Sequence, residues 1–91
     1  MEQRLGFVGI VVENRQSVPM VNEILSSFGG IIQGRIGVPN HESGVAVIGL
    51  IVNGTGDQLG AMTGQLGNLP GVQVKSALTA AKKKEKEMES R

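Results

Sequence analysis

The stretch that decides the fold is residues 45–52, VAVIGLIV, in which every residue is apolar or glycine. It has the length and the Val and Ile content of a buried β-strand, and it is short for a buried helix. A second stretch of the same kind, residues 5–12 (LGFVGIVV), lies near the start of the chain. Together the two stretches predict a pair of strands in one sheet.

Between these two stretches the apolar period changes to that of an amphipathic helix. From residue 18 to residue 28, Val, Leu and Phe recur at helical spacing. Ser17 is the expected N-cap of this helix, and Gly29-Gly30 is its expected end. Residues 31–38 then predict a further strand, which contains two glycines.

A second helix is predicted after the turn Asn53–Gly56. Thr55 and Gln58 match the Thr-x-x-Gln capping box at its start. Pro70-Gly71 ends it, and residues 72–78 predict a fourth strand. Three glycines follow one another at a spacing of four along the helix, and each costs roughly 0.5–1 kcal/mol relative to Ala. We interpret this stripe, formed by Gly56, Gly60 and Gly64, as a surface for close approach of the other helix or of a partner, and the alternative is a ligand that lies against the exposed backbone.

The order of elements is therefore β-α-β-β-α-β. Four strands and two helices in fewer than eighty residues predict an α+β, ferredoxin-like fold, with a four-stranded antiparallel sheet and both helices on one face. We expect this domain to comprise residues 1–78. Residues 79–91 (TAAKKKEKEMESR) predict a charged tail that is flexible or helical.

The two most apolar strands carry apolar residues on both of their alternating sets. Two helices can cover one face of the sheet, so the second face needs another partner. We therefore expect a homo-oligomer, a dimer or tetramer, that assembles through the sheet. The residues expected at this interface are Val8, Ile10, Val12, Ala46, Ile48 and Leu50.

Composition excludes several classes of function. The chain has no Cys, which removes disulfides, thiolate metal sites, iron–sulfur ligation and cysteine nucleophiles. With Phe7 and Phe28 as its only aromatic residues, it lacks a base-stacking platform. Residues 1–78 carry four basic and five acidic side chains, and Glu residues interrupt the basic tail. We therefore expect no direct nucleic-acid binding.

The same composition indicates where the protein works and what it does not catalyse. No apolar run reaches the roughly 18 residues of a membrane span, and the first residues do not resemble a signal peptide. We expect a cytoplasmic protein with no membrane partner. His41 is the one histidine, so it is a weak metal candidate, because a site needs three or four ligands. We expect no enzyme activity, no metal and no cofactor.

Four segments carry a resemblance to a known family: residues 10–15 (IVVENR), 21–25 (VNEIL), 35–39 (RIGVP) and 60–76 (GAMTGQLGNLPGVQVKS). With the aliphatic third strand, they make residues 5–78 similar to the iron-only hydrogenase system regulators. These are small ACT-like proteins that are themselves similar to the C-terminal domain of nickel-responsive repressors. The resemblance implies an ACT-like module that assembles through its sheet and takes part in regulation, with transcriptional regulation as the expected setting.

Two functions follow as alternatives. The first is a homo-oligomeric regulatory module that senses a small ligand or a partner, which includes a protein partner in hydrogenase regulation or maturation. The second is a structural or assembly partner of a redox enzyme that binds no small ligand. For the first alternative, we expect ligand contacts at the turn after the first strand and at the start of the second helix, namely at Asn14, Arg15, Ser17, Gly54, Thr55 and Gly56.

Overall fold

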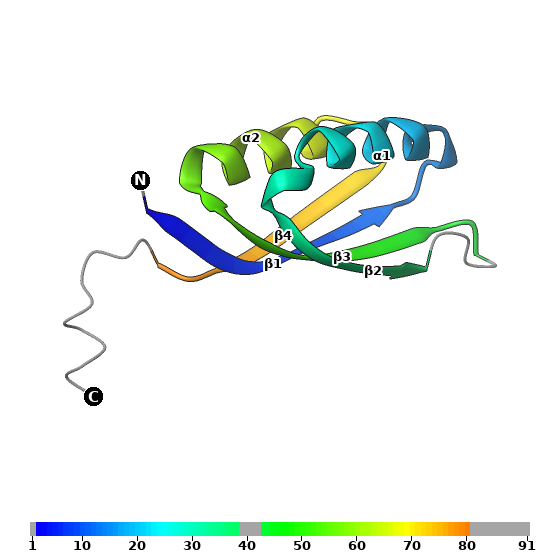
Figure 1. Ribbon diagram of the computed structural model, residues 1–91. Helices are drawn as coiled ribbons and strands as arrows, with labels where there is room; N and C mark the ends of the chain where they lie inside the picture. Colours follow the sequence, from blue (N-terminus) through cyan, green and yellow to red (C-terminus); the bar gives the residue numbers. More distant parts are fainter. Residues whose placement is uncertain (1, 39–42, 81–91) are drawn as a thin grey trace.

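The computed structural model describes residues 2–38 and 43–80, which form one sheet covered by two helices (Figure 1). Short 3-10 turns precede and follow the first helix. The elements are, in chain order, β1 (Gln3–Val12), η1 (Arg15–Ser17), α1 (Val18–Ser27), η2 (Gly29–Ile31), β2 (Ile32–Val38), β3 (Ala46–Thr55), α2 (Gly56–Gly67) and β4 (Val72–Leu78).

The sheet is antiparallel, and its strand order is β2-β3-β1-β4. The two strands with the most apolar sequences, β1 and β3, are therefore central, and they pair over their whole length from Gln3↔Thr55 to Val12↔Ala46. Both helices lie on the same face of the sheet, and the opposite face carries no element of the described chain (Figure 1). The predicted ferredoxin-like fold is confirmed.

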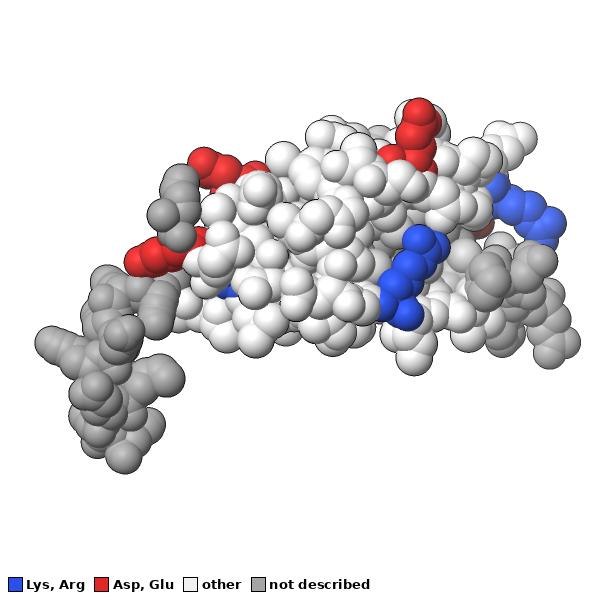
Figure 2. Space-filling model, in the orientation of Figure 1, with Lys and Arg blue, Asp and Glu red and all other residues white. Residues whose placement is uncertain are grey.

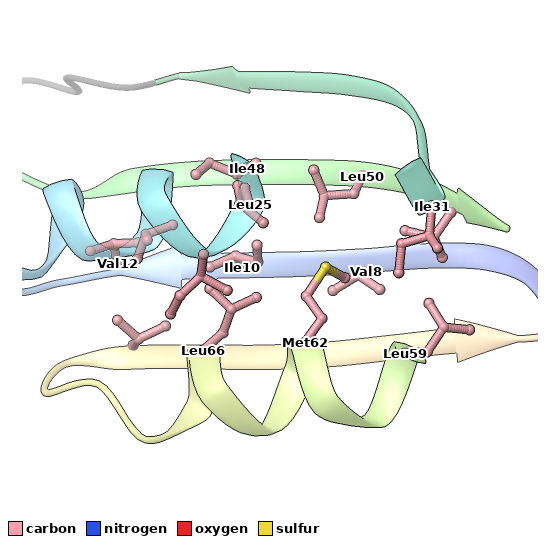
Figure 3. Packing of buried hydrophobic residues seen from close by; sticks show 14 of the residues in the cluster. Val8, Ile10, Val12, Leu25, Ile31, Ile48, Leu50, Leu59, Met62 and Leu66 are labelled. Carbon is pink, nitrogen blue, oxygen red and sulfur yellow. The ribbon is translucent and has the colours of Figure 1, made fainter. Parts of the chain in front are cut away.

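The core lies between the helices and the sheet. Val8, Ile10 and Val12 point from β1 toward the helices, where they meet Leu25 of α1 and Met62 of α2 (Figure 3). Fifteen apolar residues are buried in this one cluster. Burial of an aliphatic side chain is worth about 1.5–3 kcal/mol, so this layer supplies most of the stabilisation of the fold.

The face of the sheet that was expected to be open is the face that the helices cover. Val8 and Leu50 are fully buried, and the same holds to within a few per cent for the rest of the expected interface set. That set is therefore core, and its prediction as an oligomer interface is wrong. The reason is the two-residue period of a strand, because choosing the other alternating set exchanges the two faces completely. The residues concerned are Val8, Ile10, Val12, Ala46, Ile48 and Leu50.

The start of α1 differs from the prediction. Ser17 makes no capping hydrogen bond to the helix. Instead, Ser17 is buried, and its hydroxyl donates a hydrogen bond of 2.7 Å to the carbonyl of Pro70. The side chain of Asn14 caps the preceding 3-10 turn by accepting from the backbone N–H of Gln16. The turn before α1 is thus fastened to the turn before β4.

The start of α2 is as predicted. The hydroxyl of Thr55 accepts from the backbone N–H of Gln58, and the amide oxygen of Gln58 accepts from the backbone N–H of Thr55. This reciprocal pair satisfies two backbone donors at the helix end. Strand β3 continues to Thr55, three residues further than predicted, because its last residues pair with the beginning of β1.

The glycine stripe of α2 does not serve contact between the helices. A Cβ atom built on Gly56, Gly60 or Gly64 meets no atom within 4 Å. Close packing against α1 therefore does not account for these glycines, and the interpretation as a helix-to-helix contact is wrong. The part of that interpretation that concerns a partner stays a prediction.

Candidate functional site

The uncovered face of the sheet is largely apolar across β1, β2 and β3 and carries Gln73 and Lys75 on the edge strand β4, and we call it the open face. Residues that pair directly across strands share a face, so the register defines its membership. Exposure of the large side chains on it ranges from 43% for Phe7 to 72% for Ile36. The large apolar residues exposed on this face are Leu5, Phe7, Ile36, Val38, Val47 and Ile51.

Glycines at the centre of the open face let an aromatic ring lie flat against the sheet. Gly9 of β1 pairs with Gly49 of β3. A Cβ on Gly49 would come within 2.9 Å of the ring of Phe7, and one on Gly9 within 3.2 Å. Beside the ring is a depression of about 470 Å³ that reaches from Ile36 on β2 to Lys75 on β4.

Charge is nearly absent from the open face. Among its described positions, Lys75 is the charged one, and it lies on the edge strand β4 opposite Gly9. Figure 2 shows a different side of the molecule, on which acidic and basic residues are also sparse and do not gather by sign. An uncharged apolar surface rimmed by polar residues is typical of a site of protein association.

The six residues expected to contact a ligand lie in two places at opposite ends of the sheet. Asn14, Arg15 and Ser17 follow the end of β1, whereas Gly54 pairs with Arg4 near its beginning. At about 3.3 Å per residue, the two places are on the order of 25 Å apart. They are therefore two separate candidate positions.

At each of the two candidate positions, some residues have a structural role that explains the residue type without a ligand. Ser17 and Asn14 use their side chains in the hydrogen bonds described above. A Cβ on Gly54 would come within 2.9 Å of Ile31, so glycine there permits close packing. Arg15 is exposed and Gly56 faces open space. Whether any of these residues contacts a ligand remains a prediction.

A cavity that the sequence did not reveal lies between α1 and the sheet. Its volume is about 350 Å³. It forms because β2 presents Arg35 and Gly37, rather than large apolar side chains, on its helix-facing side. The two glycines of the strand were a signal of missing side-chain volume, but they do not indicate which face is left unfilled. The residues around the cavity are Val12, Val18, Val21, Asn22, Arg35, Gly37, Ala46 and Ile48.

No metal centre or membrane helix is found in the described part of the chain. Residues 2–38 and 43–80 contain no group of three or more His, Cys, Asp or Glu residues that could hold a metal ion. Within the same ranges, no helix has both the length and the apolar character needed to cross a bilayer. His41 lies outside the described residues, as does the predicted tail from residue 81 onward. Thr79 still pairs with Leu5 of β1.

Comparisons with known proteins agree with this architecture. The chain is similar to the structure of the uncharacterized protein TM1266 from Thermotoga maritima, with 36% identity and a TM-score of 0.79, over 85% of this chain and 98% of that one. It is also similar to the ACT domain of GTP pyrophosphokinase from Chlorobium tepidum, with 21% identity and a TM-score of 0.65, over 85% of this chain and 89% of that one. A comparison with curated proteins gave no match.

A family profile matches residues 4–76, which span all four strands and both helices. Its description is "TM1266-like: Iron-only hydrogenase system regulator, putative". The match covers most of the chain, and it includes every segment on which the resemblance in the sequence was based. The chain belongs to the TM1266-like family of iron-only hydrogenase system regulators.

Proposed function

We propose that this protein is a cytoplasmic, non-enzymatic regulatory module that works as a homo-oligomer and responds to a small ligand or a protein partner. The observation that carries the proposal is the open face. The family description supplies the setting, which is regulation of an iron-only hydrogenase system. The ACT-domain likeness supports the fold.

A second copy of the chain fits the open face better than a charged partner does. The face carries six large apolar side chains at 43–72% exposure. Two such sheets stacked face to face about a two-fold axis bury the same residues on both subunits and need no opposite charge. Lys75 lies on an edge strand, so its ammonium group can remain in water while its aliphatic stem is covered.

Light scattering behind size exclusion tests the association. We expect the wild type to be a dimer or tetramer and Ile51→Glu to weaken association at least about tenfold, because a buried unpaired carboxylate is costly. Met20→Glu is the matched control, since Met20 has the same 47% exposure but lies on α1. A monomeric wild type, or equal effects of the two variants, would contradict self-association through the open face.

The sensing part needs a separate measurement. A ligand that binds the native state raises its melting temperature, so thermal unfolding in the presence of amino acids, nucleotides, organic acids and metal ions tests it. A shift from one class of compounds supports the regulatory module. If no compound raises the melting temperature, the result favours the alternative, an assembly partner of a redox enzyme that binds no small ligand.

A further inference from the structure

The cavity between α1 and β2 is built for a small molecule with one acidic end, and we propose that it binds a short aliphatic monocarboxylate. This inference rests on the proposed function, because it names the ligand class that the regulatory module would sense. The cavity volume of about 350 Å³ is at the small end of the range for ligand sites.

The walls of the cavity are apolar. Val12, Val21 and Ile48 come from β1, α1 and β3, and each is buried in the core cluster. Gly37 forms the side toward β2, and a Cβ there would come within 2.9 Å of the carbonyl oxygen of Val47. Glycine at this position therefore keeps the space free of a side chain. An aliphatic tail is the group that these walls accommodate.

Two polar side chains complete the lining; both are exposed, and they are hydrogen-bonded to each other. A terminal guanidinium nitrogen of Arg35 on β2 donates a hydrogen bond of 3.1 Å to the side-chain oxygen of Asn22 on α1. Within the described residues, no carboxylate is paired with this guanidinium. Guanidinium groups offer a fork of donors that matches a carboxylate. Arg35 can therefore hold an acidic head group while Asn22 orients the fork.

The same lining disfavours an amino acid. A free amino acid brings an ammonium group as well as a carboxylate, and at the exposed polar end formed by Arg35 and Asn22 this ammonium would lie beside the guanidinium cation. No Asp or Glu is among the described residues that line the cavity, and the side-chain oxygen of Asn22 is engaged with Arg35. A monocarboxylate without an ammonium group satisfies the site with the groups that are present.

The test is a titration of the full-length, isotope-labelled protein with sodium isovalerate, followed by amide chemical shifts. Isoamyl alcohol has the same hydrocarbon tail without the charge, and leucine adds the ammonium group. We expect isovalerate to shift the amides of Val18, Asn22, Arg35 and Ala46 with saturation. We expect the alcohol and leucine to bind at least about tenfold more weakly.

Two variants and one control localise the binding. Arg35→Gln removes the charge from an exposed side chain and should weaken isovalerate binding about tenfold. Val18→Phe fills the cavity from the beginning of α1 and should abolish saturable shifts, with folding checked by the dispersion of the remaining spectrum. Arg4→Gln removes a cation near the beginning of β1 that does not line the cavity, and this variant should bind isovalerate as the wild type does.

The outcomes separate this inference from the proposed function. No saturable shift with millimolar isovalerate, equal binding by Arg35→Gln, or shifts confined to the turn at Asn14 would overturn the cavity assignment. If isovalerate fails while Ile51→Glu still dissociates the oligomer, the association through the open face stands without this ligand. If the protein is monomeric and isovalerate binds, the cavity assignment stands and the association does not.

Discussion

The ring of Phe7 lies against Gly49 of the neighbouring strand, so closely that a Cβ on Gly49 would come within 2.9 Å of two ring atoms. The register does not pair the two residues directly, because Gly49 pairs with Gly9 and Phe7 with Ile51. The ring thus extends along the sheet over the position where two side chains are missing. A glycine pair in two central strands is thereby covered by an aromatic ring of the same face.

Because of this contact, we expect Gly49→Ala to change the shape of the open face while the fold stays intact. The new methyl group must displace the ring of Phe7, which can rotate outward, so we expect a loss of about 1 kcal/mol in the free energy of unfolding. We also expect weaker association. Urea denaturation and sedimentation measure the two effects. Gly34→Ala is the control, since its Cβ would meet Ile51 at an ordinary 3.9 Å. Equal effects of both changes would refute the role of the ring contact.

We expect a side chain at Gly71 to lower the free energy of unfolding more than one at Gly49 does, because Gly71 has a φ of +71° and no room for a side chain. A Cβ there would come within 2.6 Å of the Cβ of Asn14 and 2.9 Å of its backbone nitrogen. Gly71→Ala should cost more than about 2 kcal/mol, since the clash adds to the cost of a left-handed conformation. Gly44→Ala shares the positive φ, but its Cβ meets one atom, at 3.9 Å. That control should cost about 1 kcal/mol.

The hydrogen bond from the hydroxyl of Ser17 to the carbonyl of Pro70 links the turn before α1 to the turn before β4, and we expect it to contribute to stability. Ser17→Ala removes its hydrogen bond and leaves the carbonyl of Pro70 without this donor. We expect a loss of about 1 kcal/mol, measured by urea denaturation. Ser26→Ala lies on the exposed side of α1 and should change stability by less than about 0.5 kcal/mol. An equal loss in both variants would show that the bond contributes nothing particular.

The glycine stripe of α2 predicts a gain in stability. Because a Cβ at Gly60 or Gly64 meets open space, alanine there should stabilise the protein by about 0.5–1 kcal/mol each through helix propensity. Thermal melting measures the gain, and sedimentation shows whether association changes. Unchanged association agrees with contact through the open face. Dissociation of the oligomer by either alanine would instead place the interface on α2.

The fold could be predicted from the sequence because its signals are local and agree with one another. The capping box at Thr55 and Gln58, the turn before β4 and the change of period after residue 17 each mark a boundary. Ser17 shows the limit of such signals. A serine before a helix predicts a cap, but here a carbonyl from a turn fifty-three residues away is the better acceptor for its hydroxyl.

The sequence predicts that an apolar face of the sheet is exposed, but our choice of which face this is was wrong. That one apolar face would be left without helices followed from the count of elements. The pattern does not identify which of the two faces this is at first sight, because both alternating sets of residues in β1 and β3 are mostly apolar. The set that contains Val8 and Ile10 has its glycines, Gly6 and Gly54, toward the ends of the strands, whereas the other set is broken in the middle by the facing pair Gly9 and Gly49. The set with the continuous apolar middle became the core, because a helix layer needs continuous apolar contact.

The cavity between α1 and β2 depends on tertiary structure alone. Arg35 and Gly37 lie on the helix-facing side of β2, but an irregularity in register between Ile32 and Gly34 precedes them. Such a shift changes which residues of the strand face the helices. No pattern in residues 31–38 locates that shift, so the missing side-chain volume could not be assigned to either face from the sequence.

The most direct test of the central claim is isotope-filtered NMR on a mixture of labelled and unlabelled protein. It detects only contacts between copies. We expect intermolecular cross-peaks between the ring of Phe7 and the methyl groups of Val47 and Ile51, because these side chains share the open face. A dimeric sample whose intermolecular cross-peaks come from Met20 and other helix residues, with none from Phe7, would contradict assembly through the open face.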